Sequence, residues 1–286
     1  MAINTYGDVV GWSNPNGSSA AFQFIGGAMD YPFGANVGQS SRATGINDAR
    51  TVVGYAYDPN SGYDRAFILQ GDSPTILGTF GGRTSYAYAI NNDGAVVGIA
   101  QDATLYEQPF LYQNGAMTAL PIPVGHVAGG ALGISSNGVI AGFSLDPVYG
   151  QQPIIWNGPT FTSISLAGLP FGGGGAWAVN SSGTVIGYGT GVDAAWVWKD
   201  GQAHRLSDIT DPGPYSGLQI QAVYGINDSG QMVGFARLGT SQGLIGGAVL
   251  LSPIPELSSA AMFAVGLSLL VLCRRRAMCR TDLCDR

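Results

Sequence analysis

The sequence predicts an all-β chain of about six repeats, and three observations support this fold class. A nine-residue pattern, seen at residues 90–98, recurs with starts 43 to 47 residues apart. Glycine supplies 45 of the 286 residues and only 10% are charged, so turns are dense and helix-forming Glu and Lys are scarce. The apolar segments between turns are short and lack helical periodicity. Four strands per repeat of about 44 residues is the period expected of a propeller blade, so we expect a propeller-like body over residues 1–252.

Each copy of the pattern opens with an apolar residue followed by a turn. A type I turn closed by a residue in the left-handed region fits the spacing. Asparagine side chains can bond back to the turn backbone, and glycine takes positive φ without steric cost. The residues that we expect in these roles are Asn4, Asn47, Asn91, Asn180 and Asn227, with Ser135 in the fourth copy, and Gly7, Gly94, Gly138, Gly183 and Gly230. Arg50 replaces glycine in the second copy, at an expected cost of about 1 kcal/mol unless the turn changes type.

An apolar pair such as Val96-Val97 then begins the return strand, and a glycine ends each copy. A glycine inside a strand suits a bulge or a close backbone approach. A third strand follows, as in residues 109–112, and after another turn a shorter fourth strand, as in residues 116–120. The sixth repeat stops after Leu251 without a fourth strand, and the first copy lacks the short strand that precedes the others. We therefore expect upstream sequence that supplies the missing strand and an export signal.

Charge is distributed unevenly along the chain. Residues 1–256 carry a net charge of −9 with a single lysine, whereas residues 257–286 carry +3. An acidic body of this kind argues against nucleic-acid binding. All three cysteines lie in the tail, so the body forms no disulfide, which is compatible with any redox compartment.

No group of residues in the body predicts catalysis. His126 and His204 fall at unrelated repeat positions, and Glu107 is the only glutamate before residue 256, so a paired-carboxylate glycosidase would depend on aspartates. Oxygen ligands at Asp58, Asn60 and Asp64 resemble a calcium loop only weakly, because the terminal bidentate glutamate is missing. A polar hairpin loop is the preferred interpretation, and we expect no metal, with calcium as the one alternative.

Aromatic residues recur with the repeat, and most are expected in the core between blades. Trp177 and Tyr88 lie just before their turns, so they are the two that could instead reach a central face and stack on sugars. Core packing is the preferred interpretation for both residues.

The last 34 residues, 253–286, differ from the body. A short motif at 253–256 contains Pro255 and Glu256, an uncharged apolar run covers 257–273, and a basic end, 274–286, begins with Arg274, Arg275 and Arg276. Seventeen helical residues reach about 25 Å, slightly short of a hydrocarbon core of about 30 Å. We expect one transmembrane helix over 257–273, with the arginines cytoplasmic and the body outside. A buried helix of the globular body is the alternative.

This tail resembles a PEP-CTERM sorting signal, in which a Pro-Glu-Pro motif, a transmembrane segment and a basic cluster direct cleavage by an exosortase in Gram-negative bacteria. Pro255 and Glu256 occupy the first two motif positions, and Leu257 stands where the second proline belongs. The resemblance implies transient anchoring in the inner membrane, an exosortase partner, and export to the cell surface or outer envelope.

The body resembles extracellular HAF-type repeats, whose Ile-Asn-x-x-Gly-x-Val-Val-Gly core appears at residues 3–11, 90–98 and 226–234. That resemblance implies the architecture and no particular activity. The expected function is therefore non-enzymatic: an exported surface or matrix protein with a binding or structural role, with envelope or exopolysaccharide as the expected partner. A propeller hydrolase or lyase acting on extracellular glycans is the alternative.

Overall fold

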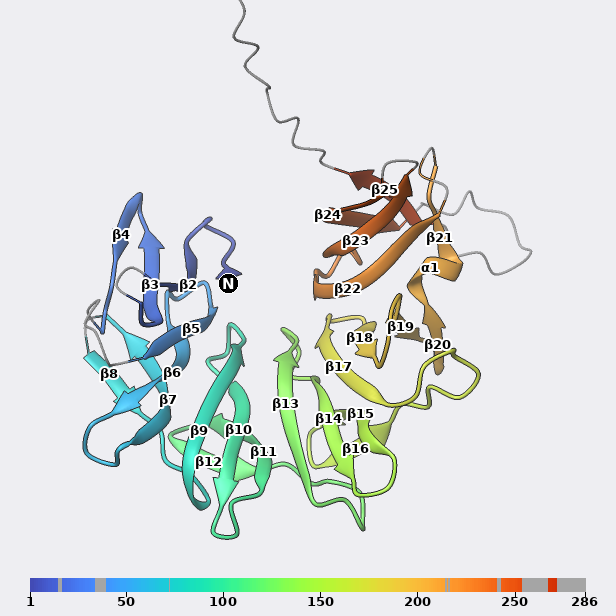
Figure 1. Cartoon of the computed structure of the whole chain (residues 1–286). Helices are drawn as coiled ribbons and strands as arrows, with labels where there is room; N and C mark the ends of the chain where they lie inside the picture. Colours follow the sequence, from blue (N-terminus) through green and yellow to red (C-terminus); the bar gives the residue numbers. More distant parts are fainter. Residues whose placement is uncertain are drawn as a thin grey trace, which may run out of the picture.

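The computed structural model describes residues 1–14, 17–33, 40–71, 73–213, 215, 217–240, 243–253 and 267–271. Within them the chain forms six sheets, here called blades 1 to 6, arranged in sequence order around a central axis (Figure 1). Their strand pairs are antiparallel except for one parallel pair at the outer edge of blade 6. The prediction of an all-β propeller with about six blades is confirmed.

The first three blades each contain four consecutive strands. Blade 1 comprises β1 (Ala2–Ile3), β2 (Val9–Ser13), β3 (Ala20–Ile25) and β4 (Ala28–Asp30); blade 2 comprises β5 (Ser41–Ile46), β6 (Val52–Asp58), β7 (Tyr63–Gln70) and β8 (Ser73–Ile76); blade 3 comprises β9 (Gly81–Ile90), β10 (Val96–Asp102), β11 (Glu107–Gln113) and β12 (Ala116–Ala119). The first strand of each blade lies nearest the axis (Figure 1).

Blades 4 and 5 follow the same plan, and blade 6 differs at its outer edge. Blade 4 comprises β13 (Ala128–Ile134), β14 (Ile140–Asp146), β15 (Gly150–Asn157) and β16 (Thr160–Ser163); blade 5 comprises β17 (Gly174–Val179), β18 (Val185–Gly189), β19 (Ala195–Lys199) and β20 (Gln202–Arg205). A single helical turn, α1 (Leu206–Ile209), leads to blade 6, which comprises β22 (Leu218–Ile226), β23 (Met232–Thr240), β24 (Gly243–Pro253), β25 (Leu267–Val271) and β21 (Thr210–Asp211).

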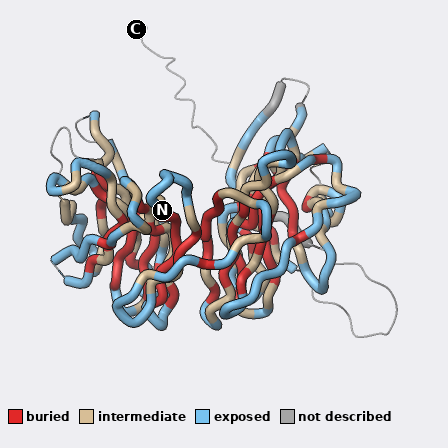
Figure 2. Tube along the Cα trace, turned by 90° about the horizontal axis from the view of Figure 1, so that it is seen from below, coloured by how far each residue is buried: buried red, intermediate tan, exposed pale blue. Residues whose placement is uncertain are grey.

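The paired apolar residues that begin each second strand explain how neighbouring blades pack. Successive side chains of a strand point to opposite faces of the sheet, so each member of the pair faces a different blade. Val52 belongs to the core between blades 1 and 2, whereas Val53 belongs to the core between blades 2 and 3. Val96 and Val97 divide in the same way between the two sides of blade 3. Five such cores connect the six blades, and Figure 2 shows the buried segments inside the blades.

The outer faces of blades 1 and 6 form no such core with each other in the part of the chain that the structure describes. Met232 is buried in the core between blades 5 and 6, but its neighbour Val233 is 51% exposed. Ile3 of blade 1 is 66% exposed. The ring of blades is therefore open between its first and last members (Figure 1).

The C-terminal tail departs from the expectation in the few residues that are described. The sixth repeat was expected to lack its fourth strand, but β25 occupies that position, pairing antiparallel with β24. Leu267–Val271 lies within the segment 257–273 expected as a membrane-spanning helix, and here it is extended. A short apolar run satisfies either a helix or a strand, and the free edge of β24 offers it backbone partners. Among the described residues, no helix has the length and apolar character needed to cross a membrane.

Candidate functional site

A β-bulge in the innermost strand marks the same repeat position in five blades. On each innermost strand one residue is skipped in the pairing with the next strand, two positions before the opening residue of the turn. The skipped residues are Thr44, Tyr88, Leu132, Trp177 and Tyr224. Bulges re-aim side chains, and all five of these residues line one central cavity, together with Met1 from the corresponding position of the first repeat.

The glycine that ends each copy of the pattern lies opposite the bulge. A Cβ at Gly98 would stand 2.0 Å from the carbonyl oxygen of Tyr86, and a Cβ at Gly54 would stand 1.9 Å from that of Arg42. The expectation that this glycine permits a bulge and a close backbone approach is confirmed at both positions. The bulge therefore depends on the glycine, and the bulge in turn directs one side chain of each blade into the cavity.

The cavity has a volume of about 460 Å³ and lies where the innermost strands converge. Its aromatic lining is formed by Trp12, Tyr55, Tyr88, Trp177 and Tyr224. Trp177 is 40% exposed and meets Tyr224 edge to face, with ring centroids 6.4 Å apart. Cavities of this size with aromatic walls and few polar groups are typical of small-ligand sites.

One side of the cavity breaks the repeat symmetry. Arg42 of β5 pairs across the strands with Tyr55, whereas the corresponding position holds Gly130 in blade 4 and Gly175 in blade 5. The Arg42 guanidinium carbon lies 4.2 Å from the centre of the Trp12 ring and 6.0 Å from that of Tyr55. Blades 1 and 2 thus place the Arg42 guanidinium at the cavity wall, whereas blades 4 and 5 have a glycine without a side chain at the corresponding position.

Arg42 contributes a charged side chain to the cavity lining. Among the described residues that line the cavity it is the one side chain of Asp, Glu, Lys, Arg or His type, and it forms no ion pair with a described carboxylate. Burial raises the pKa of both Tyr55 and Tyr88 above the usual value for a phenol. Both phenols stay protonated at neutral pH, so they serve as hydrogen-bond donors and are poor general bases.

The asparagines expected in the turns form a second ring, which links the blades. Asn91 Oδ1 accepts hydrogen bonds from the backbone N–H groups of Asp93 and Ala95, and its Nδ2 donates to the carbonyl oxygen of Ser135 in blade 4, 3.3 Å away. Asn4, Asn47 and Asn180 donate to the next blade in the same way. We call this chain of bonds the asparagine ladder. Gly7, Gly94, Gly138, Gly183 and Gly230, the expected turn glycines, have φ of +78° to +83°.

The ladder changes at Ser135 and ends at Asn227. Ser135 lacks an amide and keeps its hydroxyl within its own turn, while Asn137 Nδ2 donates to the carbonyl oxygen of Ser181 instead. Asn227 Nδ2 donates to Gln231 Oε1 of its own turn, since blade 6 faces the opening of the ring. Each of these asparagine side chains thus forms hydrogen bonds within its own turn, and it bonds to a second blade only where a next blade is present.

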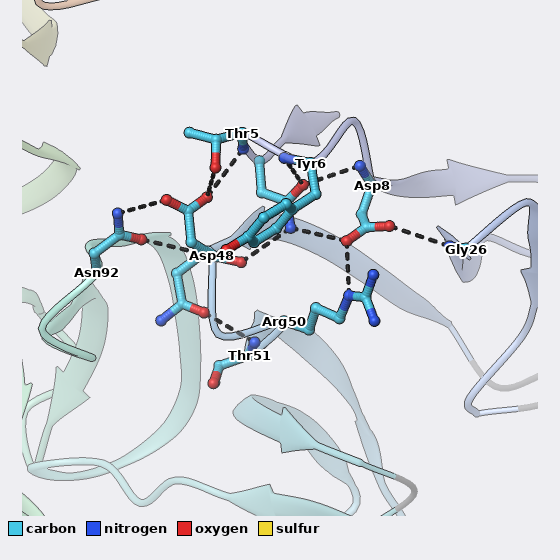
Figure 3. Close-up of polar contacts among 10 residues, drawn as sticks. Thr5, Tyr6, Asp8, Gly26, Asp48, Arg50, Thr51 and Asn92 are labelled. Carbon is cyan, nitrogen blue, oxygen red and sulfur yellow. Dashed lines mark hydrogen bonds and ion pairs between the residues drawn. The ribbon is translucent and has the colours of Figure 1, made fainter.

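Arg50, the exception among the turn glycines, keeps the turn and pairs with blade 1. Its φ is +59°, so the strained left-handed conformation is retained. Its Nε donates to Asp8 Oδ2 at 2.9 Å, and Figure 3 shows this ion pair beside the contacts of Thr5, Asp48 and Asn92. Hydrogen bonding from Asn4, with a smaller contribution from Arg50, holds the pKa of Asp8 below its usual value. The ion pair to the neighbouring blade offsets part of the conformational cost.

Three residues considered for calcium do not converge. Asp58 pairs with Tyr63 and Asp64 pairs with Tyr57 across the β6–β7 hairpin, so the two carboxylates point to opposite faces of the sheet. Asp58 Oδ1 accepts the backbone N–H of Asn60 within the loop. The described residues contain no cluster of three His, Cys, Asp or Glu side chains able to hold a metal ion.

The remaining candidates from the sequence are core aromatics, Trp177 at the cavity wall, and residues of the tail that lie outside the described part of the chain. Trp156 and Trp196 are fully buried between blades, as expected for core aromatics. Core packing, the preferred interpretation for Trp177, does not describe a side chain that is 40% exposed at a cavity wall. Pro255, Glu256 and the arginines Arg274, Arg275 and Arg276 lie outside the described residues.

Most of the cavity lining was missed by the sequence analysis, although a signal for it exists. The bulge position holds Thr44, Tyr88, Leu132, Trp177 and Tyr224, which vary widely in size, while the residue that follows it is always Gly or Ala. A variable residue beside an invariably small one, at a fixed distance before each turn, is a pattern that aligned repeats reveal.

No protein-family model and no curated protein sequence matches the chain. Among solved structures, it is similar to the β-propeller domain of the trilobed protease from Pyrococcus furiosus, with 11% identity over 87% of this chain and 77% of that chain and a TM-score of 0.54. TolB from Acinetobacter baumannii has 12% identity over 71% of this chain and 55% of that chain, with a TM-score of 0.49. A lectin from Aleuria aurantia has 10% identity over 95% and 94%, with a TM-score of 0.46. At such identities the similarity establishes the β-propeller fold alone.

Proposed function

We propose that this protein is an exported, non-enzymatic propeller that binds polysaccharide in its central cavity. The observation that carries the proposal is the set of side chains, one from each bulge, that face a single cavity with an aromatic lining. Flat aromatic rings suit the apolar faces of sugar rings, and polar groups at the wall suit their hydroxyls.

The composition of the cavity supports binding over the alternative of glycan hydrolysis or elimination. Hydrolysis by most glycosidases requires two carboxyl groups on either side of the scissile bond, and none of the described residues lining the cavity is an aspartate or glutamate. Elimination requires a base, and burial keeps the phenols of Tyr55 and Tyr88 protonated. Incubation with bound glycans should therefore leave their chain length unchanged, and shorter or unsaturated products would contradict the non-enzymatic assignment.

Titration calorimetry of the full chain with a panel of oligosaccharides tests the binding. Trp177→Ala should weaken binding of any ligand found by about tenfold, because it removes one stacking surface. Phe161→Ala is the matched control, since Phe161 is similarly exposed but lies on β16, away from the cavity. Equal affinity of the wild type and Trp177→Ala for every ligand would exclude the cavity as the binding site.

The location of the protein is part of the same proposal. Pro255, Glu256 and the arginine cluster support export and sorting through the PEP-CTERM-like tail, with an exosortase as partner and transient anchoring by a membrane helix over 257–273. The expected helix over 257–273 and strand β25 share residues 267–271, which cannot adopt both conformations at once. We therefore infer that the strand forms only when the tail is not in a membrane. Mass spectrometry of the mature protein should find a C-terminus near Glu256, and an intact chain in the cytoplasm would overturn the surface location.

A further inference from the structure

The wall of the cavity between blades 1 and 2 carries a cation in an unusual setting. Arg42 is stacked on Trp12 and lies near the Tyr55 ring, in a protein whose formal net charge is −6. No described carboxylate lies within ion-pair distance of its guanidinium. Its Nη2 donates to the hydroxyl of Ser19 at 3.4 Å, and the phenol oxygen of Tyr55 is a second hydrogen-bonding neighbour of the guanidinium.

Stacking on aromatic faces holds the guanidinium plane and leaves its edge free. The five N–H donors of arginine lie in the guanidinium plane, so a cation–π contact such as that of Arg42 with the Trp12 ring does not require any of them as a hydrogen-bond donor. A long bond to Ser19 and the contact with the Tyr55 phenol together leave most of the five donors for a ligand. A planar fork held in one orientation matches a carboxylate, which it can bind through two parallel hydrogen bonds.

From this geometry we infer that the ligand of the cavity carries a carboxylate and that its chemical class is a uronic-acid glycan, with Arg42 as the carboxylate-binding residue. The inference rests on the proposed carbohydrate-binding function and names its ligand class. The carboxylate of a uronic acid lies at the edge of the sugar ring. A sugar stacked on the aromatic lining can therefore direct its carboxylate towards the exposed edge of Arg42.

The repeat supports a specific role for Arg42, because nothing in the fold requires a cation at this position. The corresponding residue is Tyr86 in blade 3, Gly130 in blade 4, Gly175 in blade 5 and Ala222 in blade 6. All four of these blades form the same bulge without a cation at this position. Arg42 is therefore an addition to the scaffold, and its removal should leave the fold intact.

The test compares acidic sugars with matched neutral sugars on the full chain. Trimers of galacturonate, glucuronate and mannuronate are titrated beside the trimers of galactose, glucose and mannose, in which a hydroxymethyl group replaces each carboxylate. At least one acidic trimer should bind about tenfold more tightly than its neutral partner, as expected for charge-assisted hydrogen bonds. Arg42→Gln should remove that preference while leaving the affinity for the neutral trimer unchanged.

Arg83→Gln is the matched control. Arg83 is also stacked on an aromatic ring, 5.6 Å from the centre of Tyr63, but it is exposed and does not line the cavity. The thermal midpoints of both variants should match that of the wild type. An acid preference that persists in Arg42→Gln would overturn the role of Arg42. Neutral trimers that bind as tightly as all acidic ones would overturn the ligand class while leaving the carbohydrate-binding function, and no binding by any trimer would overturn both.

Discussion

The turn and the bulge of each repeat lie only three residues apart, as Asn91 and Tyr88 do, yet they behave differently. The turn position is asparagine in five of the six repeats, because its side chain serves both its own turn and the junction with the next blade. The bulge position differs in every repeat except for a second tyrosine, because its side chain faces a cavity that places no packing constraint on its size. In this protein the repeat positions that hardly vary build the scaffold, and the positions that vary build the site.

The largest loss of stability is expected at the glycine that ends each repeat pattern, where a side chain would clash with the backbone of the neighbouring strand. Gly98→Ala would place a Cβ 2.0 Å from the carbonyl oxygen of Tyr86 and 2.7 Å from the Phe110 ring. We expect the free energy of unfolding to fall by about 3 kcal/mol or more, measured by chemical denaturation. Gly247→Ala is the control, because a Cβ there meets nothing within 4 Å and the expected change is within about 0.5 kcal/mol. Similar losses in both variants would show that the close approach at Gly98 is not the cause.

The asparagine ladder should show a smaller effect that depends on position. Asn91→Ala leaves the buried N–H of Ala95 without its acceptor and removes one of the two donors of the Ser135 carbonyl, which keeps the bond from the Gly138 N–H; the expected cost is about 2 kcal/mol. Asn227→Ala should cost about 1 kcal/mol or less, because Asn227 is exposed and donates only within its own turn, where water can replace it. Equal costs in denaturation experiments would mean that the bond to the next blade adds nothing.

These two positions also show what the sequence could predict. A periodic Asn and Gly pattern reports local turn chemistry, which repeats because the local backbone repeats, so the fold followed from it. The ladder bond joins residues 44 positions apart, and no local pattern reveals that the same amide serves two blades. The cavity residues were mostly missed for a related reason: a bulge changes the direction of one side chain, and strand periodicity alone assigns Trp177 to a packed face. Strand β25 was missed because a short apolar segment suits a helix equally well.

At the bulge, loss of a large side chain should barely change stability. Trp177→Ala removes edge-to-face contacts with Tyr188 and Tyr224 from a partly exposed ring, and no buried polar group is left unpaired. We expect the free energy of unfolding to change by less than about 1 kcal/mol. Circular dichroism during thermal unfolding provides the measurement. A loss as large as that for Asn91→Ala would place the bulge residue in the scaffold and weaken the comparison between the two positions.

The smallest expected effect is a change of stability with pH, and it tests only the carboxylates that bond from one turn to the next. Hydrogen bonds from the backbone and side chain of Thr5, and then from Asn92, hold the pKa of Asp48 below the usual value for an aspartate, while the backbone N–H of Ser181 does the same for the pKa of Asp228. A carboxylate with a lowered folded-state pKa contributes stability above the unfolded pKa and loses it as the pH falls through the folded pKa. The thermal midpoint should therefore be constant above about pH 5 and fall below about pH 4.

Asp48→Asn should make that fall in the thermal midpoint smaller. Asp93→Asn is the control and should leave the fall unchanged, because Asp93 is exposed and its side chain forms no hydrogen bond between blades in the described residues. If Asp48→Asn and the wild type lose stability in acid to the same extent, the charge of Asp48 adds nothing to the stability of the turns.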